Sequence, residues 1–446
     1  MNKIHQKCSF TMKTFINKHL FFINMNKEII KQSIIEQNES FNKDFEKIIT
    51  RTKLEYIKSI KDLPHIIIIS GLRRAGKSTF LKEINKEFYN KEFSYLNFED
   101  EKLFNFDVKE FNLIYETFLE LDSNQKTIFL DEIQNVDNWE IAIRRLYENN
   151  IKFYLTGSNA LMLSKELGTK LTGRHINITL FPFSFEEFLK FNNFEFEKKD
   201  FYISQKKSKL KNLFEKYIKL GGIPEFLKYE RKEIIEGIYN DILYKDILVR
   251  YKLSDERSLK ELAKYLLSNV GKEFSYNKLK KSLDFGSLNT VKNYISYLEN
   301  SYLIFSVEKY DNSLKKQLIA NKKVYSIDTS FINNVSFKIS EDYGRILENV
   351  VFIELKRREK EIYYHKDNKE CDFVIRDGLN IVEAIQVTKN LSSEETKKRE
   401  IEGLIEAMNK YKLKNGLILT DDEENEFIIE NKKIIVKPIW KWLLEK

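Results

Sequence analysis

Residues 64–82 read PHIIIISGLRRAGKSTFLK, and this stretch decides the fold of the 446-residue chain. The four isoleucines at 66–69 are β-branched, and such a run predicts a central parallel strand that is covered on both faces. The segment from Gly71 to Thr79 follows with the pattern GxxxxGK[ST], and apolar residues at helical spacing continue from it. The order of strand, glycine-containing loop and helix predicts a phosphate-binding loop.

Each residue type in this loop has a physical task. Gly71 and Gly76 let the backbone curl so that its N–H groups point inward, and the helix that follows adds the positive end of its dipole. We expect Lys77 to reach the β- and γ-phosphates of a nucleotide and the Ser78 hydroxyl to hold Mg²⁺. An ordinary glycine turn that carries a lysine is the alternative, and the flanking strand disfavours it. The predicted nucleotide-binding residues are Gly71, Leu72, Arg73, Arg74, Ala75, Gly76, Lys77, Ser78 and Thr79.

Further apolar runs at 93–98, 126–130, 152–155 and 176–180 predict more strands, and helical segments separate them. Strands that alternate with helices predict a doubly wound parallel sheet of the P-loop NTPase type. The ligands of such sheets lie at the carboxyl ends of the strands. Residues that bind ligand or take part in chemistry are therefore expected at these ends.

Asp131 and Glu132 follow directly on the strand at 126–130. One carboxylate at this place can hold Mg²⁺, and a second beside it can position or deprotonate the attacking water. We assign Asp131 to the metal, together with Ser78, and Glu132 to the water. Two acidic residues after a strand are a weak signal alone, but the phosphate loop upstream strengthens it.

Polar residues at the next strand ends complete the candidate site. Thr156, Ser158 and Asn159 are placed to hydrogen-bond the γ-phosphate or the water, and the alternative is that they cap the next helix. Arg174 is placed to stabilise charge that develops in the transition state, and a solvated arginine is about equally consistent with its position. The predicted catalytic residues are Lys77, Glu132, Asn159 and Arg174.

The amino-acid composition and the length indicate which broad class of protein this is. Lys and Arg number 76 against 68 Asp and Glu, and 42% of residues are hydrophobic, as in a globular protein. A chain of this length suggests roughly two to four domains. Cys8 and Cys371 lie far apart without a partner motif, so we expect a reduced, cytoplasmic protein without structural zinc. No apolar run is long enough for a membrane span, and we expect no export, because the apolar run at 20–23 is too short for a signal core.

Taken together, the segments at 71–78, 129–132, 156–159, 173–174 and 182–187 resemble the AAA+ class of P-loop ATPases. More closely, the chain resembles prokaryotic proteins in which such an ATPase module precedes a winged-helix segment and a restriction-endonuclease-like domain. The similarity covers roughly residues 50–440. It implies the roles given above, with a first-sensor polar group among Thr156, Ser158 and Asn159.

Residues 251–330 carry a different pattern. Helical patterns at 261–270, 276–283 and 288–299 precede an apolar hairpin from 302–305 to 324–327, which predicts a winged helix. The segment has fourteen Lys and Arg against nine Asp and Glu, so double-stranded DNA is a candidate partner. A winged helix that joins proteins instead is the alternative. The candidate DNA-contacting residues, all expected to be exposed, are Asn289, Lys292, Asn293, Lys315, Lys316, Lys322 and Lys323.

The C-terminal part has the element order that a restriction-endonuclease-like core requires, with a helix at 344–355, strands at 361–365, 371–375 and 381–388, a helix at 394–412 and a strand at 416–420. Such a metal site needs an acid on the first helix, an aspartate on the second strand and a carboxylate-x-lysine on the third. Glu348 and Asp372 fit. The third strand offers Glu383-Ala-Ile385 or Gln386-Val-Thr388, and neither has the lysine, so we expect an inactive domain.

The predicted domains are a lead-in at 1–50 that is open to a mis-assigned start, an AAA+ core at 51–190, a helical lid at 191–250, a winged helix at 251–330 and a restriction-endonuclease-like domain at 331–446. A break at 220–225 within the lid is a hinge or a plain turn. We expect a Mg²⁺-dependent ATPase that couples ATP binding and hydrolysis to rearrangement of its later domains. The alternatives are a nucleotide-gated DNA-binding regulator and a DNA nuclease. A protein partner and the oligomeric state stay open.

Overall fold

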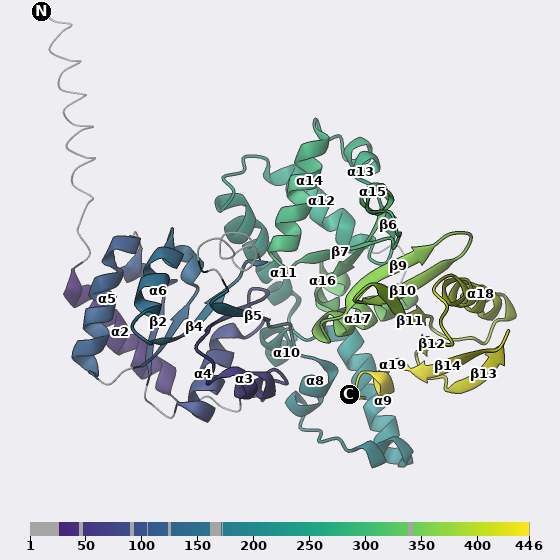
Figure 1. The fold of residues 1–446 in the computed structure, drawn as a ribbon, viewed down its shortest axis with the longest axis horizontal. Helices are drawn as coiled ribbons and strands as arrows, with labels where there is room; N and C mark the ends of the chain where they lie inside the picture. Colours follow the sequence, from purple (N-terminus) through teal and green to yellow (C-terminus); the bar gives the residue numbers. More distant parts are fainter. Residues whose placement is uncertain are drawn as a thin grey trace, which may run out of the picture.

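The computed structural model describes residues 26–43, 48–89, 93–104, 106–123, 126–160, 171, 173–337 and 342–445 (Figure 1). Its N-terminal module is built on a parallel sheet of five strands, as predicted. In spatial order they are β2 (Ser94–Asn97), β3 (Thr127–Asp131), β4 (Lys152–Gly157), β1 (Ile66–Ser70) and β5 (His175–Thr179). The carboxyl end of β1 therefore lies between those of β4 and β5.

The isoleucine run of β1 forms the centre of this module because successive side chains of a strand point to opposite faces. Ile66 and Ile68 join a core on one face, and Ile67 and Ile69 join a core on the other. All four are at most 1% exposed, which confirms the prediction of a strand covered on both faces. The helices of the module are α2 (Lys27–Asn42), α3 (Leu54–Ile60), α4 (Lys77–Phe88), α5 (Phe111–Leu121) and α6 (Trp139–Tyr147), with the short helices η1 (Glu101–Leu103), η2 (Val108–Glu110) and η3 (Ile133–Asn135).

Helix α2 lies along the edge of the sheet, although we expected its residues to be a lead-in. The backbone N–H of Tyr95 in β2 donates to Asn38 Oδ1 at 3.0 Å, and that of Asn97 donates to Gln37 Oε1 at 2.6 Å. These side chains satisfy donors that an edge strand would otherwise expose. The residues before 26, including Met25, lie outside the described part of the chain.

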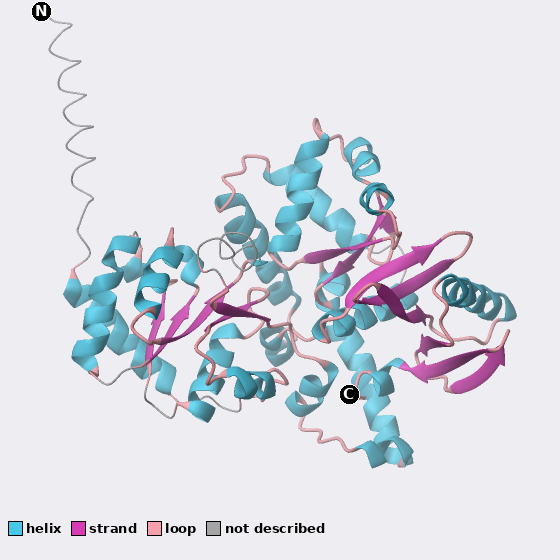
Figure 2. Ribbon diagram, viewed as in Figure 1, coloured by secondary structure: helices cyan, strands magenta, loops and turns pink. Residues whose placement is uncertain are grey.

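The segment predicted as a lid is helical (Figure 2). Helix α8 (Phe185–Phe191) ends the predicted core. The lid segment contains η5 (Lys198–Tyr202), α9 (Ser204–Leu220), α10 (Pro224–Tyr229), α11 (Lys232–Asp241) and the π-helix η6 (Ile242–Val249). The break before Pro224 is a tightly packed turn. Gly222 N–H donates to Asp328 Oδ2 at 2.7 Å, and a Cβ at Gly222 would clash with the carbonyl oxygen of Phe183.

The next module contains the predicted three helices and hairpin. Its elements are α12 (Glu256–Ser268), β6 (Glu273–Phe274), α13 (Tyr276–Ser282), α14 (Leu288–Asn300), β7 (Ile304–Glu308), α15 (Leu314–Ile319), β8 (Lys322–Ser326) and α16 (Thr329–Asn334). The strands form an antiparallel sheet in the order β6-β8-β7. We call residues 256–334 the three-helix module.

The C-terminal module has a mixed sheet of six strands in the order β13-β14-β12-β11-β10-β9. Its elements are α17 (Tyr343–Arg357), β9 (Glu361–Lys366), β10 (Glu370–Asp377), β11 (Asn380–Val387), α18 (Glu394–Lys410), β12 (Asn415–Thr420), β13 (Asn425–Ile429), β14 (Lys432–Pro438) and α19 (Ile439–Trp442). The order from α17 to β12 agrees with the prediction, whereas the last two strands and α19 were not predicted.

One apolar cluster spans all the modules, and the N-terminal and C-terminal sheets also have apolar clusters of their own. A single cluster of buried residues extends from Leu72 and Ala75 in the phosphate loop, through the lid and the three-helix module, to Trp440 in α19. The chain after β7 also reaches the C-terminal sheet, where the backbone N–H of Tyr310 donates to the carbonyl of Tyr364 at 2.9 Å. Within the described residues, no helix has both the length and the apolar character needed to cross a membrane.

Candidate functional site

The phosphate loop begins where β1 ends, and its backbone has the curvature that the glycines were expected to supply. Gly76 adopts φ +93° and immediately precedes α4, and Arg74 also has a positive φ of 66°. A Cβ at Gly71 would clash with the carbonyl oxygen of Leu180, so glycine is required there by close approach of the two backbones. The loop therefore forms a concave turn directed at the first turn of a helix, which suits an anion.

Lys77 and Glu132, which belong to different elements, meet beside this loop. Lys77 Nζ lies 3.3 Å from Glu132 Oε1 and donates to the carbonyl oxygens of Gly71 and Leu72, each at 3.3 Å. Burial opposes ionisation of Glu132, but the charge of Lys77 and a hydrogen bond from Gln134 hold its pKa below the usual value. Glu132 also adopts φ 52°, which is uncommon outside glycine and typical of residues under a site constraint.

Asp131 lies at the end of β3 and is fully buried. Its carboxylate accepts hydrogen bonds from Tyr95 Oη at 2.9 Å and from the Thr156 hydroxyl. Burial and the charge of Glu132 raise the pKa of Asp131, and hydrogen bonds from Ser78, Thr156 and Tyr95 oppose that rise. A hydroxyl and a carboxylate side by side are oxygen ligands that Mg²⁺ prefers, so Ser78 and Asp131 fit the predicted metal.

The polar residues after β4 lie at the carboxyl ends of the strands, as Asp131 and Glu132 do. Thr156 Oγ1 accepts a hydrogen bond from the backbone N–H of Glu132 at 3.0 Å, so this threonine contacts both acidic residues of the site. Ser158 Oγ accepts from Gln134 Nε2 at 3.3 Å. Asn159 is buried next to them at the end of the same strand. The helix expected to begin near Ala160 falls at residues 161–170, which lie outside the described part of the chain.

Arg73 connects the phosphate loop to the lid. Its guanidinium binds Asp246 in η6 through two hydrogen bonds of 3.0 Å and Glu99 through one of 2.8 Å. Asp246 also accepts a hydrogen bond from Ser158 Oγ at 3.2 Å. One buried carboxylate of the π-helix therefore holds both the loop and the end of β4. π-helical turns occur frequently at functional sites.

Arg51 supports the phosphate loop from behind. Its Nη1 donates to the carbonyl of Ala75 at 3.0 Å, its Nη2 donates to that of Phe181, and its Nε donates to Glu187 Oε1 at 3.2 Å. The backbone N–H of Arg51 donates to both oxygens of Glu83, at 3.1 and 3.3 Å. Burial raises the pKa of Glu83 to about 7.

A cavity of about 620 Å³ opens over the phosphate loop. Its lining includes the polar Lys77 and Ser78 as well as apolar surface from Ile49, Phe191 and Pro224. A nucleotide requires polar groups for its phosphates and apolar surface for its flat ring. The size and the chemistry of the cavity fit ATP.

Arg174 does not lie where its predicted role at the nucleotide site would require. It immediately precedes β5, which runs parallel to β1. It therefore lies at the amino ends of the strands, whereas the phosphate loop lies at their carboxyl ends. Its Nη1 contacts Glu148 at 2.6 Å, and its guanidinium lies over the ring of Tyr147. A residue that precedes a parallel strand belongs to the amino ends of the strands, whereas the ligands gather at the carboxyl ends, so Arg174 is not brought to the phosphate loop of its own chain.

Sequence reasoning missed several residues of this site. Arg51 and Asp246 reach it from segments that carry no motif, Glu187 was noted only as part of the segment at 182–187 and was given no role, and Pro224 was seen only as part of a break. The hydrophobic period of 242–249 predicts a helix but gives no sign that its aspartate turns toward the phosphate loop. Only tertiary packing brings these residues together.

The comparisons agree with this geometry. An AAA domain matches residues 63–189, and two domains of unknown function, DUF8612 and DUF4143, match residues 211–342 and 343–442. The uncharacterized protein MJ1544 of Methanocaldococcus jannaschii is 36% identical over 440 residues, which cover 94% of this chain and 96% of that protein. The chain belongs to the same family as MJ1544. Its N-terminal module is accordingly a P-loop module of the AAA type.

Other relatives are also uncharacterized. A Haemophilus influenzae protein is 29% identical over 88% of this chain and 97% of its own length. Among solved structures, Aeropyrum pernix ORC1 in complex with DNA covers 72% of this chain and 98% of its own at 11% identity, with a TM-score of 0.30. Cdc6p from Pyrobaculum aerophilum covers 71% and 98% at 12% identity, with a TM-score of 0.28.

Proposed function

We propose that this protein is a Mg²⁺-dependent ATPase that uses ATP binding and hydrolysis to rearrange its three-helix and C-terminal modules. The observation that carries the proposal is the meeting of Lys77 and Glu132 beside the phosphate loop, with the Ser78–Asp131 pair next to them. The match of an AAA domain to residues 63–189 supports it.

The roles follow from the charges. Lys77 binds the β- and γ-phosphates, and Glu132 acts as the base that positions water. Ser78 and Asp131 hold Mg²⁺, which neutralises phosphate charge when bound. Lys77 now lies against Glu132 and two loop carbonyls, so phosphates must draw its ammonium away from Glu132. When Lys77 moves away, the hydrogen bond from Gln134 and the charge of Arg73 still favour the ionised carboxylate of Glu132, which accepts a proton from water.

Two contacts support coupling to the later modules. Asp246 binds Arg73 of the phosphate loop, and the same stretch of chain continues to Tyr251, whose ring stacks on Tyr297 of α14 at a centroid distance of 3.7 Å. Independently, the hydroxyl of Tyr302, just before β7, lies 2.5 Å from Ser70 Oγ at the end of β1. A change in the phosphate loop therefore has two direct routes into the three-helix module.

ATP hydrolysis by purified protein and by Lys77→Ala, Glu132→Gln and Glu148→Gln tests the enzymatic part of the proposal. Glu148 is exposed and lies at the amino edge of the sheet beside Arg174, so E148Q is the matched control. We expect E148Q to retain the wild-type rate, K77A to lose ATP binding, and E132Q to bind ATP while hydrolysing it at least about 100-fold more slowly. Equal rates in all four proteins would refute the proposed roles.

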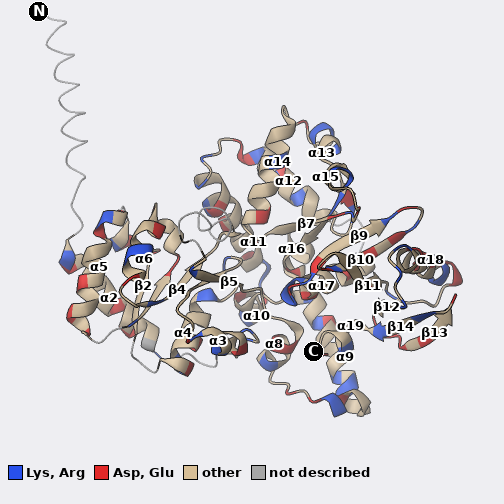
Figure 3. Ribbon diagram, in the orientation of Figure 1, with Lys and Arg blue, Asp and Glu red and all other residues tan. Residues whose placement is uncertain are grey.

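A nucleotide-gated DNA-binding regulator is the second candidate, and the exposed face of α14 favours it. We propose that the three-helix module is a winged helix and that Asn289, Lys292 and Asn293, all exposed, face duplex DNA. Helices α13 and α15 of the same module carry further lysines, which add positive charge to it (Figure 3). Lys322 and Lys323 do not contribute as we expected, because Lys322 binds Glu308 at 2.6 Å and Lys323 is buried.

Duplex binding measured at several salt concentrations tests this second candidate. We expect the affinity to fall steeply with salt, and the double variant Asn289→Ala/Lys292→Ala to weaken it at every concentration. Lys260→Ala is the control, because its ammonium pairs with Glu256 on α12. Failure of the wild type to bind DNA even at low salt would remove the candidate and leave a protein-directed switch.

A further inference from the structure

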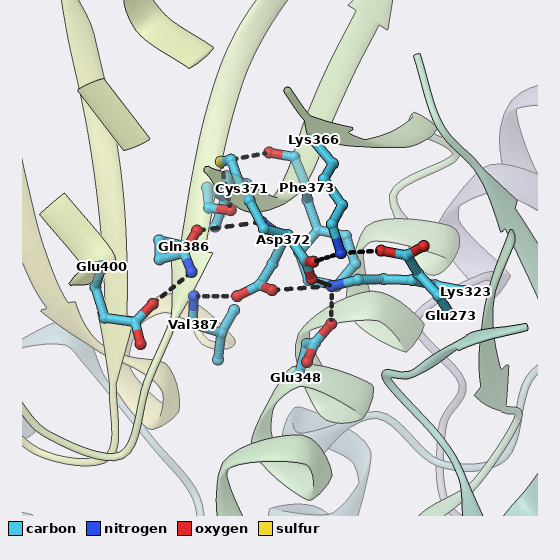
Figure 4. Close-up of polar contacts among 12 residues, drawn as sticks. Glu273, Lys323, Glu348, Lys366, Cys371, Asp372, Phe373, Gln386, Val387 and Glu400 are labelled. Carbon is cyan, nitrogen blue, oxygen red and sulfur yellow. Dashed lines mark hydrogen bonds and ion pairs between the residues drawn. The ribbon is translucent and has the colours of Figure 1, made fainter. Parts of the chain in front are cut away.

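A second charged centre lies in the C-terminal module, and its cation comes from another module. The ammonium of Lys323, on β8, lies 3.0 Å from Glu348 Oε1 of α17, 2.8 Å from Glu370 Oε1 and 3.0 Å from Asp372 Oδ1, both of β10 (Figure 4). The lysine side chain is only 1% exposed. Three carboxylates from two elements therefore surround one buried ammonium.

Each carboxylate is held in place from behind. Tyr325 Oη donates to Glu348 Oε1 at 2.6 Å, the backbone N–H of Val387 donates to Asp372 Oδ2 at 3.0 Å, and Lys366 Nζ lies 3.0 Å from Glu370 Oε2. Burial and the charge of Asp372 raise the pKa of Glu348 to about 7, and the charge of Lys323 opposes that rise. The centre thus concentrates negative charge that needs a cation.

The cation does not come from β11, the third strand of the C-terminal module, where a restriction-endonuclease-like site would have its lysine. Gln386 of β11 accepts from the backbone N–H of Asp372 at 3.1 Å and donates to Glu400, and Thr388 donates to the carbonyl of Asn390 at 3.3 Å. The positions that would carry an acid and a lysine on this strand are therefore a neutral amide and a hydroxyl. Lys323 reaches the centre from the neighbouring sheet instead.

We propose that Lys323 is a built-in cation that replaces a divalent metal at the Glu348–Asp372 centre and latches β8 onto the C-terminal module. Removing one partner from a buried ion cluster leaves uncompensated charge, which is strongly unfavourable. The centre therefore takes no divalent cation while β8 is docked, and withdrawal of β8 uncovers the carboxylates.

The position of β8 makes the latch responsive to the rest of the molecule. Two residues after the strand ends, Asp328 accepts the hydrogen bond from Gly222 in the lid at 2.7 Å. One short segment thus contacts the lid at one end and the carboxylate centre at the other. The latch does not depend on ATP hydrolysis, so its test stands apart from that of the proposed function.

The variant Lys323→Met tests the latch, with Lys322→Met as the matched control on the same strand. The readouts are the melting temperature with and without Mn²⁺, and Tb³⁺ luminescence excited through tyrosine, because Tyr325 directly contacts Glu348. We expect K323M to melt lower than wild type, to be restabilised by Mn²⁺ and to gain Tb³⁺ luminescence. Wild type and K322M should show neither metal response.

Further variants distinguish charge from packing. Adding Glu348→Gln and Asp372→Asn to K323M removes the uncompensated charge, so we expect the triple variant to recover stability and to lose the Mn²⁺ response. Mn²⁺ binding to wild type that is abolished by D372N would overturn the proposal. It would also be overturned if K323M and the triple variant were both unfolded while K322M folded, or if K323M folded without any metal response.

Discussion

Arg73 of the phosphate loop and Asp246 of the π-helix η6 form a two-point ion pair, in which the arginine Nε and Nη2 each lie 3.0 Å from one carboxylate oxygen. Bidentate pairs of this kind fix geometry as well as charge. Asp246 is 3% exposed, so water cannot replace its partner. The pair therefore ties the nucleotide loop to the lid segment that contacts α14.

The variant Asp246→Asn tests this tie. Asparagine keeps the size of the side chain but removes the charge, so we expect ATP to bind while its effect on residues 256–334 is lost. Limited proteolysis of the three-helix module with ATP and with ADP provides the measurement. Asp241→Asn is the control, because Asp241 pairs with exposed Lys245. A D246N protein with the full nucleotide-dependent difference would contradict the role of this pair.

The variant Arg51→Met should destabilise the N-terminal module. The pair of Arg51 with Glu187 is buried on both sides, with 6% and 3% of the side chains exposed, and breaking such a pair costs about 3–5 kcal/mol. Chemical unfolding followed by circular dichroism measures the loss. Lys53→Met breaks a pair with exposed Glu359 and should cost less than about 1 kcal/mol.

Adding Glu187→Gln to R51M checks the cause of that loss. If the cost arises from an unpaired buried carboxylate, the double variant recovers part of the stability. No recovery would assign the cost to lost packing of the arginine instead.

The pKa of Glu83 predicts a pH dependence of stability. Burial raises it in the folded protein to about 7, above the usual 4.5, so the folded state binds more protons than the unfolded state between these values. The free energy of unfolding therefore falls as pH rises from about 4.5 to 7 and loses nothing more from this group above that window. The variant Glu83→Gln should remove this component.

Unfolding of wild type and E83Q, measured at intervals from pH 5 to 8, checks the sign. The stability difference between the two proteins should shift in favour of E83Q as pH rises. A constant difference across the range would show that Glu83 does not titrate there.

Local sequence signals predicted much of the fold and part of the site. The isoleucine run, the glycine spacing and the strand that ends in Asp131-Glu132 are each contained within a few residues, so period and composition are sufficient to find them. Arg174 directly precedes the strand predicted at 176–180, so its place at the amino ends of the parallel strands followed from the sequence, although its predicted role did not take this into account.

Long-range contacts account for what could not be predicted. Asp246 and Tyr302 reach the nucleotide loop from segments whose local pattern is an ordinary helix or strand. Lys323 was expected on an exposed wing. Because β8 packs against α17 and β10, its ammonium is instead buried among carboxylates. A charged residue in a strand gives no sign of which neighbour will cover it.

The coupling of nucleotide state to the later modules is tested most directly by hydrogen–deuterium exchange in E132Q with ATP and with ADP. Glu132→Gln should hold ATP without hydrolysing it, so each nucleotide state can be observed at equilibrium. We predict different exchange in η6, α14 and β7–β8 between the two states. Identical exchange in these segments, with both nucleotides bound, would contradict the account.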